Sequence, residues 1–420
     1  MKYKKPILIF FILSVLFLSC SKNEVTDPGN IDYQQKIFLT EKGKALVQAD
    51  NTFGIKLFKN LNEISEGNGN IIISPLSISI ALGMTYNGAN GETEAAMQNT
   101  LELQGLSVEE INQGYKNLID ALTTVDPQVT LNIPNSIWYR NTFSVEQEFI
   151  DLNQNYFYAE VNPLDFNDPE AVDIINNWVA VNTNNKIEKI LDEIPIEAVM
   201  YLINAVYFNA TWKYEFDEQY TLPETFYLAD GTTKQVDMMK QEATLNYISN
   251  NLFEAVDLYY GSSNFSMVVM LPRNGYSPGD IINEMTPENW SDWMTGFGEM
   301  NINLSLPKFK LRYDTLLNQV LGNLGMGIAF NPGMADFTGI NSNGSLYISF
   351  VKHKTYIDVN EEGTEAAAVT IVGIEYTSIG GDTPYQFMVN RPFLFAIKER
   401  DTQAIIFLGK VMEPEYEEEE

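Results

Sequence analysis

The feature that most constrains the fold of this chain is the separation of two hydrophobic periodicities along it. Apolar residues recur at helical spacing mainly in the N-terminal half, which predicts helices over 46–61, 93–101, 108–123, 145–157 and 169–184. Strand-like runs dominate the C-terminal half, and in chain order the predicted strands are 70–73, 129–139, 199–208, 265–271, 301–309, 346–359, 387–397 and 404–411. Strands and helices do not alternate regularly, so the pattern argues against a doubly wound parallel sheet and predicts an α+β domain.

One large domain is expected, because no internal repeat and no long low-complexity linker divides the chain. Residues 41–414 form this predicted domain. Residues 415–420 are almost entirely glutamate and are expected to be a solvated, disordered tail.

The N-terminus has the layout of a secretory signal. Residues 1–19 combine three lysines with an apolar run that is too short to span a bilayer comfortably. The run ends at Ser19-Cys20, which resembles a bacterial lipobox, in which the cysteine receives a lipid and becomes the new N-terminus. An ordinary signal peptide with a chance cysteine is the alternative. The polar residues 20–40 are then expected to be a flexible tether.

Composition excludes several classes of function. Cys20 is the only cysteine, so the predicted domain has no disulfide, no catalytic thiol and no cysteine-ligated metal. The net charge of −30 becomes about −33 once the three signal lysines are removed. Such a surface repels phosphate backbones and anionic headgroups, which argues against nucleic-acid binding.

Residues 358–378 carry a period-two pattern with one uncharged face. After a glycine at position 363, alternate residues are small or apolar, namely Thr364, Ala366, Ala368, Thr370, Val372 and Ile374. Both acids of the stretch, Glu365 and Glu375, lie on the opposite parity. A strand with one buried face has this period. A plain edge strand followed by a long surface loop fits the periodicity equally well.

The start of this stretch resembles the hinge of the reactive-centre loop of inhibitory serpins. The matching residues are Glu361, Glu362, Gly363, Thr364, Glu365, Ala366, Ala367 and Ala368. Further blocks similar to serpin signatures follow in family order at 70–77, 81–84, 88–93, 204–212, 390–395 and 407–411, with Pro414. Because the blocks together span most of the predicted domain, the chain is identified from sequence as a member of the serpin family.

The resemblance implies a serpin fold with three β-sheets, eight or nine surrounding helices and an exposed reactive-centre loop. It implies an irreversible suicide inhibitor of serine proteases, with cysteine proteases left open as further targets. A protease attacks the loop and forms an acyl-enzyme, and the cut loop inserts into the main β-sheet as an added strand. The implied partner is therefore a serine protease in covalent complex. The chain itself is expected to be a monomer without cofactor and not an enzyme.

The period-two pattern agrees with this mechanism independently. A charge on the inserted parity would enter the core unpaired, so Thr364→Arg is expected to slow insertion without unfolding the protein. Insertion from Thr364 to Thr377 covers 14 residues. At about 3.3 Å each, the attached protease would travel about 46 Å.

The cut bond is predicted by counting along the loop. Family spacing from the hinge places it at Thr377–Ser378, whereas counting back from position 390 lands at Gly381, so the loop is longer than usual beyond the cut. Three neighbouring residues remain alternatives: Ile374, Tyr376 and Ile379. No Lys or Arg lies between positions 363 and 390, which favours elastase-, subtilisin- or chymotrypsin-like targets over trypsin-like ones.

His353 is the only histidine in the chain. By resemblance it belongs to the serpin shutter, a hydrogen-bond network that controls the opening of the main sheet, together with Ser74, Ser77 and Asn204. Trp212 resembles the tryptophan that closes the top of the central strand. A histidine satisfied in the core or on the surface is the generic alternative, and its titration range leaves pH sensitivity open.

Hydrolase and metal sites are poorly supported. Residues 275–279 match the pattern G-x-S-x-G around Ser277, but Pro278 lacks the backbone N–H that an oxyanion hole needs after the nucleophile. This segment is therefore predicted to be a turn. With one histidine and no cysteine in the domain, no metal site is predicted.

A non-inhibitory serpin that acts as an envelope binding or interaction protein is the alternative function. The small residues of the hinge favour inhibition. The lipobox predicts a lipid anchor to the bacterial outer membrane as the only membrane contact, on the surface or the periplasmic face. The target protease, its origin and the face of the membrane stay open.

Overall fold

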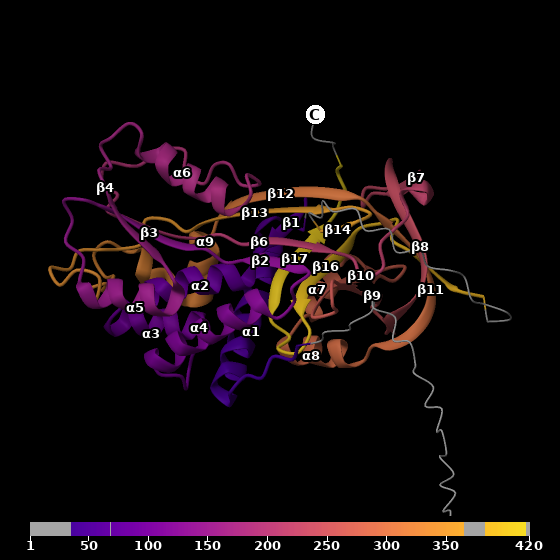
Figure 1. The fold of residues 1–420 in the computed structure, drawn as a ribbon, viewed down its shortest axis with the longest axis horizontal. Coiled ribbons are helices and arrows are strands. Elements are labelled where there is room, and N and C mark those ends of the chain that lie inside the picture. Colours follow the sequence, from indigo (N-terminus) through magenta and orange to yellow (C-terminus); the bar gives the residue numbers. More distant parts are fainter. Residues whose placement is uncertain (1–34, 68, 365–382, 417–420) are drawn as a thin grey trace, which may run out of the picture. The chain divides into compact units, whose positions relative to one another are not determined.

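The computed structural model describes residues 35–67, 69–364 and 383–416. Five helices of the N-terminal half lie together (Figure 1): α1 (Glu41–Ile64), α2 (Pro75–Tyr86), α3 (Gly91–Thr100), α4 (Val108–Thr124) and α5 (Gln147–Phe157). Each predicted helix is found within a few residues of its expected bounds. The helix predicted over 169–184 is α6 (Ala171–Asn182), and α7 (Pro278–Glu284), α8 (Pro287–Thr295) and α9 (Asn318–Leu321) follow later.

The described strands form three sheets. The largest has the spatial order β1 (Ile71–Ile73), β17 (Ile405–Val411), β16 (Phe393–Glu399), β10 (Phe265–Pro272), β9 (Phe253–Tyr260), β8 (Thr233–Ser249), β11 (Gly298–Pro307) and β15 (Tyr385–Met388), with β7 (Leu222–Tyr227) beside β8. The second, here called the main sheet, has the order β12 (Phe309–Leu316), β13 (Lys352–Val359), β14 (Gly363–Thr364), β6 (Tyr207–Thr211) and β2 (Val129–Asn132). The third contains β4 (Glu160–Leu164), β3 (Asn135–Arg140) and β5 (Met200–Asn204). The α+β class is confirmed.

Several predicted strands were wrong in detail. The run 129–139 is divided between β2 and β3 at Pro134, which has no N–H to donate to a sheet. The run 199–208 is divided between β5 and β6, because its partner changes from β3 to β2. The run 346–359 is a strand only from Lys352 onward. Strands β4, β7, β8, β9 and β12 were missed. β8 pairs with three different strands along its length, so its buried face changes and no simple alternation marks it.

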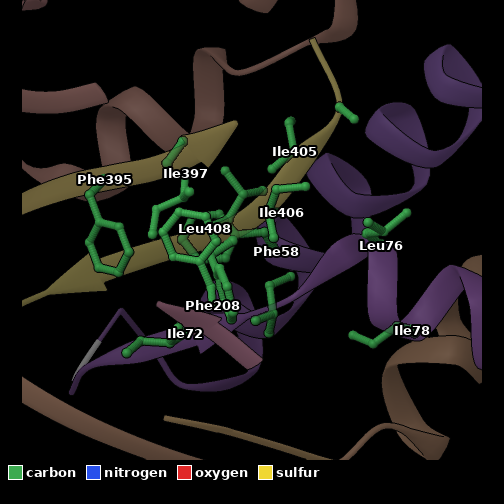
Figure 2. Packing of buried hydrophobic residues seen from close by; sticks show 14 of the residues in the cluster. Phe58, Ile72, Leu76, Ile78, Phe208, Phe395, Ile397, Ile405, Ile406 and Leu408 are labelled. Atoms are coloured by element: carbon green, nitrogen blue, oxygen red, sulfur yellow. The ribbon is translucent and has the colours of Figure 1, made fainter. Parts of the chain in front are cut away.

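The core lies between the helices and the two larger sheets. Strands β10, β16 and β17 are buried on both faces, so they appear in the sequence as continuous apolar runs. Figure 2 shows Phe58 of α1, Phe208 of β6 and Leu408 of β17 meeting in one cluster. Truncating one such side chain to alanine costs about 2–5 kcal/mol, so this cluster fixes the two sheets relative to the helices.

Both predicted ends of the domain need correction. Residues 35–40 of the expected tether lie against the domain, because the Asn264 amide donates to the carbonyl of Gln35 at 2.7 Å and the Ile37 N–H donates to Asp401 at 3.0 Å. At the other end, Glu415 and Tyr416 also contact the domain. The N–H of Lys310 donates to the carbonyl of Glu415, and the Tyr416 ring lies over two lysines. Within the described ranges, no helix is long and apolar enough to cross a membrane.

A buried carboxyl on α1 is hydrogen-bonded to α4. The hydroxyl of Tyr115 on α4 donates to Oδ1 of Asp50 on α1 at 2.8 Å, while Oδ2 has no hydrogen-bond partner among the described residues. The Ser79 hydroxyl on α2 also lacks one there. Burial raises the pKa of Asp50 from 3.8 to about 7, since the hydrogen bonds that favour the charged form are the smaller effect. The folded protein therefore keeps a proton on Asp50 that the unfolded chain releases at a much lower pH.

This proton makes stability depend on pH. Because the folded pKa is raised, the folded state binds more protons than the unfolded state between about pH 4 and 7, and stability falls as the pH rises through that window. Asp50→Asn keeps the shape without the charge. We expect its thermal midpoint to rise relative to wild type between pH 5 and pH 8, by an amount equivalent to a few kcal/mol. A difference between the two proteins that stays constant with pH would contradict the assignment.

Candidate functional site

The predicted hinge begins as a turn and then becomes a strand of the main sheet. The side-chain oxygen of Asn360 accepts the N–H groups of Glu362 and Gly363 at 3.1 and 3.2 Å, which closes the turn after β13. β14 then lies between β13 and β6, with Thr364 opposite Val359 on one side and Ala210 on the other. The segment predicted to be the reactive loop is therefore part of the sheet at its first two described residues, Gly363 and Thr364.

Gly363 is required by close approach to β6. A Cβ atom at this position would overlap the carbonyl oxygen of Ala210 and the backbone of Thr211. Any side chain would push β14 away from β6. The glycine that sequence analysis assigned to the hinge is thus needed for packing as well as for flexibility.

Thr364 is buried and makes a polar contact with Tyr260. Its hydroxyl shares a hydrogen bond of 2.5 Å with the hydroxyl of Tyr260, and only 2% of the residue is exposed. Trp212 stacks on the Tyr260 ring with centroids 4.3 Å apart, and its indole N–H donates to the carbonyl of Asn360 at 2.9 Å. The expected role of Trp212 at the top of the central strand is consistent with these contacts. Sequence analysis missed Tyr260.

Glu361 anchors the hinge through two hydrogen-bonded contacts. Its carboxylate lies 2.9 Å from the Lys308 ammonium and accepts a hydrogen bond from the Thr221 hydroxyl at 2.7 Å. Burial alone would lower the pKa of Lys308, but the hydrogen bond and charge of Glu361 outweigh it and hold that pKa above its ordinary value. The lysine therefore stays charged, and the pair fixes the end of β13 to the start of β12.

The predicted shutter is only partly a single network. Nε2 of His353 accepts the N–H of Ser74 at 3.1 Å, and the Ser74 hydroxyl accepts the N–H of Ser77 and caps α2. Asn204 does not join them. Its amide donates to the side-chain oxygen of Asn135 at 2.7 Å, a residue that sequence analysis missed, and its own Oδ1 is buried without a partner among the described residues.

Burial lowers the pKa of His353 from 6.5 to about 4, and the more distant charge of Asp314 opposes this only weakly. The imidazole is neutral at physiological pH, which is the form that can accept the Ser74 N–H. The pH sensitivity left open by the sequence is therefore confined to acidic conditions.

A slot of about 400 Å³ lies further along the two chain runs that flank β14, and its lining reaches as far as Ala205 on one run and Lys354 on the other. Its two walls are the run 200–205 and residues 345–354, its floor is α2, and the segment 187–199 after α6 covers it. Within the described residues no strand pairs with the facing edges of β13 and β5 here. Both His353 and Asn204 line the slot, so the two halves of the shutter face each other across it.

The remaining predicted residues have different outcomes. Glu365, Ala366, Ala367 and Ala368, the cut-site candidates from Ile374 to Ile379 and Cys20 lie outside the described residues. Ser277 caps α7 by accepting the N–H of Asp280, so the G-x-S-x-G match is a helix start preceded by a turn. Among the described residues, no three His, Cys, Asp or Glu side chains lie close enough to hold a metal ion.

Comparisons with known proteins agree with this geometry. The family model described as serpin (serine protease inhibitor) matches residues 48–414. Serpin A3-6 of Bos taurus is 34% identical over 92% of this chain and 93% of its own length. The thermophilic serpin tengpin in its native state is 35% identical with a TM-score of 0.79, covering 90% of this chain and 96% of tengpin. Human thyroxine-binding globulin, solved with its ligand, is 26% identical with a TM-score of 0.80, covering 89% and 99%. The chain belongs to the serpin family, whose members are mostly protease inhibitors.

Proposed function

We propose that this serpin is a suicide inhibitor that traps serine proteases by inserting its cut loop into the slot of the main sheet. The single observation that carries the proposal is the position of β14. Gly363 and Thr364 already pair with β6 and β13, and the same two chain runs form the walls of the slot further along, so after cleavage the rest of the loop could continue between them as an added strand. Strand addition satisfies the backbone groups of both facing edges.

The pairing at Thr364 fixes the register of the inserted strand. Continuing the antiparallel pairing places Ala366 opposite Phe208 and Ile357. Thr370 then falls between Asn204 and His353. Its hydroxyl would supply the donor that the buried Oδ1 of Asn204 lacks, which would complete the shutter in the cleaved state.

Both faces of the segment suit this register. The inward residues are Thr364, Ala366, Ala368, Thr370, Val372 and Ile374, and the two threonines fall at the two polar places, Tyr260 and Asn204. The outward residues 367–373 are uncharged and would face the apolar cluster beneath α6, which includes Tyr201 and Ile203. Glu365 and Glu375 lie at the two ends, where water can reach them.

The trapping step follows the chemistry of a serine protease. The protease hydroxyl attacks the carbonyl carbon of the bait residue, the amide bond breaks, and the hydroxyl proton passes to the leaving amine. An ester joins the bait residue to the protease. The slot takes the strand down to Ile374, opposite Met200, so the ester-bearing residue must follow it. Thr377 meets this condition, as do Tyr376 and Ile379, whereas a cut directly after Ile374 would leave the protease against the slot.

The comparisons support two states of such a fold. Tengpin has been solved in a native and in a latent state, with TM-scores to this chain of 0.79 and 0.78. Cleavage without trapping, by contrast, is what the alternative of a non-inhibitory binding protein predicts.

We expect the purified protein to form a covalent complex with an elastase- or subtilisin-like protease that survives denaturant on a gel. Trypsin should form none, because the loop offers no Lys or Arg. Loop cleavage without a stable complex across a broad panel of proteases would refute the inhibitor proposal.

The register predicts which charge blocks the trap. Thr364→Arg is a poor probe, since Thr364 is already buried and the variant would disturb the native fold. Thr370→Arg puts the charge on the inward face deep in the slot. The yield of covalent complex should therefore fall at least tenfold, and cut inhibitor should accumulate instead. Glu365→Arg is the matched control on the outward face and should still trap. Equal trapping by both variants would contradict the register.

We further propose that the protein is exported and anchored by a lipid on Cys20. The lipobox-like run and the polar residues after it support this, and the chain offers no other cysteine. Mass spectrometry of the mature N-terminus should find a diacylglyceryl group on Cys20, and Cys20→Ser should release the protein from membranes. Recovery of an unmodified Cys20 in the mature chain would refute the anchor.

A further inference from the structure

The C-terminal segment after β17 returns to the top of the main sheet. Pro414 is buried, and the N–H of Lys310 donates to the carbonyl of Glu415 at 2.6 Å. The ring of Tyr416 then lies over two ammonium groups, with its centroid 4.4 Å from Lys308 and 4.7 Å from Lys310. Sequence analysis expected this segment to be a free tail. Its Tyr416 ring instead covers Lys308, which directly precedes β12, and Lys310, which lies within β12.

Both cations hold carboxylates of the hinge region. Lys308 pairs with Glu361 at 2.9 Å, and Lys310 pairs with Asp358 at 3.4 Å. The Lys308 and Glu361 side chains are only 15% and 6% exposed. The Tyr416 ring thus lies over two ion pairs. The pair of Lys310 with Asp358 joins β12 to the end of β13, and the pair of Lys308 with Glu361 joins the start of β12 to the turn before β14.

The ring strengthens these links in two ways. An aromatic face attracts a cation directly, and most strongly where water is excluded. A ring over the lysines also keeps water from the ion pairs, which otherwise lose most of their strength to solvent screening. The turn before β14 also accepts two backbone hydrogen bonds. The N–H of Trp212 donates to the carbonyl of Glu362, and the N–H of Phe216 donates to the carbonyl of Glu361.

We infer that Tyr416 is a positioning residue of the reactive-loop hinge. It clamps Lys308 and Lys310 and so controls how readily the top of the main sheet opens to an uncut loop. The inference deepens the proposed function, on which its regulatory meaning rests. Loss of the C-terminal residues, for example to a carboxypeptidase, would loosen the hinge and favour premature insertion.

Amide hydrogen exchange of the full chain tests the clamp without any protease. In Tyr416→Ala, the amides of Trp212 and Phe216 should exchange about 3- to 30-fold faster, because their acceptors lie on the released turn. Tyr416→Phe keeps the ring and should exchange like wild type. Glu413→Gln, which breaks the neighbouring pair with Lys234, is the control in the same segment and should leave both amides unchanged. Unchanged exchange in Tyr416→Ala, or equal effects of Ala and Phe, would overturn the inference.

A double-mutant cycle shows whether the effect passes through the lysine. In a Lys308→Met background, Tyr416→Ala should add less to the exchange rate than it does in wild type, whereas full additivity would contradict the clamp. The functional consequence is measured separately as the rate at which trapping capacity is lost on warming without protease, and Tyr416→Ala should lose it faster. If wild type traps no protease, the proposed function fails, while the exchange data still decide the clamp.

Discussion

The structure depends on the short strand β14, which lies between two longer strands of the main sheet. Gly363 and Thr364 are held between β6 and β13 because the glycine permits close approach and the threonine meets the Tyr260 hydroxyl. Further along, within the described residues, β13 and β5 present facing edges to the slot and pair with no strand there. In the proposed mechanism, a strand added between these edges would stabilise the fold, and this gain would supply the energy for moving a protease.

The residues around β14 and the slot form two polar centres. At the top, Lys308, Glu361 and Trp212 hold the turn before β14. In the slot, His353 and Asn204 face each other without sharing a hydrogen bond. In the proposed mechanism, the upper centre would keep the hinge in place while the loop is intact. On the proposed register, Thr370 would reach the lower centre and offer a donor to Oδ1 of Asn204.

The sequence was sufficient for the fold class and for most helices of the N-terminal half, because these depend on local spacing. It could not supply Tyr260 or Asn135, which reach the site from strands distant in sequence and carry no motif of their own. The acidic composition after Pro414 masked Tyr416, whose inferred role arises only because the chain at the start of β12 places Lys308 and Lys310 beneath its ring. Likewise Thr364 was predicted to be an inserting residue, but its burial in this structure is a tertiary effect.

Cross-linking across the slot tests the central claim most directly, since the domain has no cysteine of its own. In a Cys20→Ser chain that carries Ala205→Cys and Val369→Cys, the register places both thiols opposite each other on the outward face. A disulfide should form after the loop is cut and not before. A disulfide that forms only when the second cysteine is moved to Ile371, or in neither variant after cleavage, would contradict the assigned insertion.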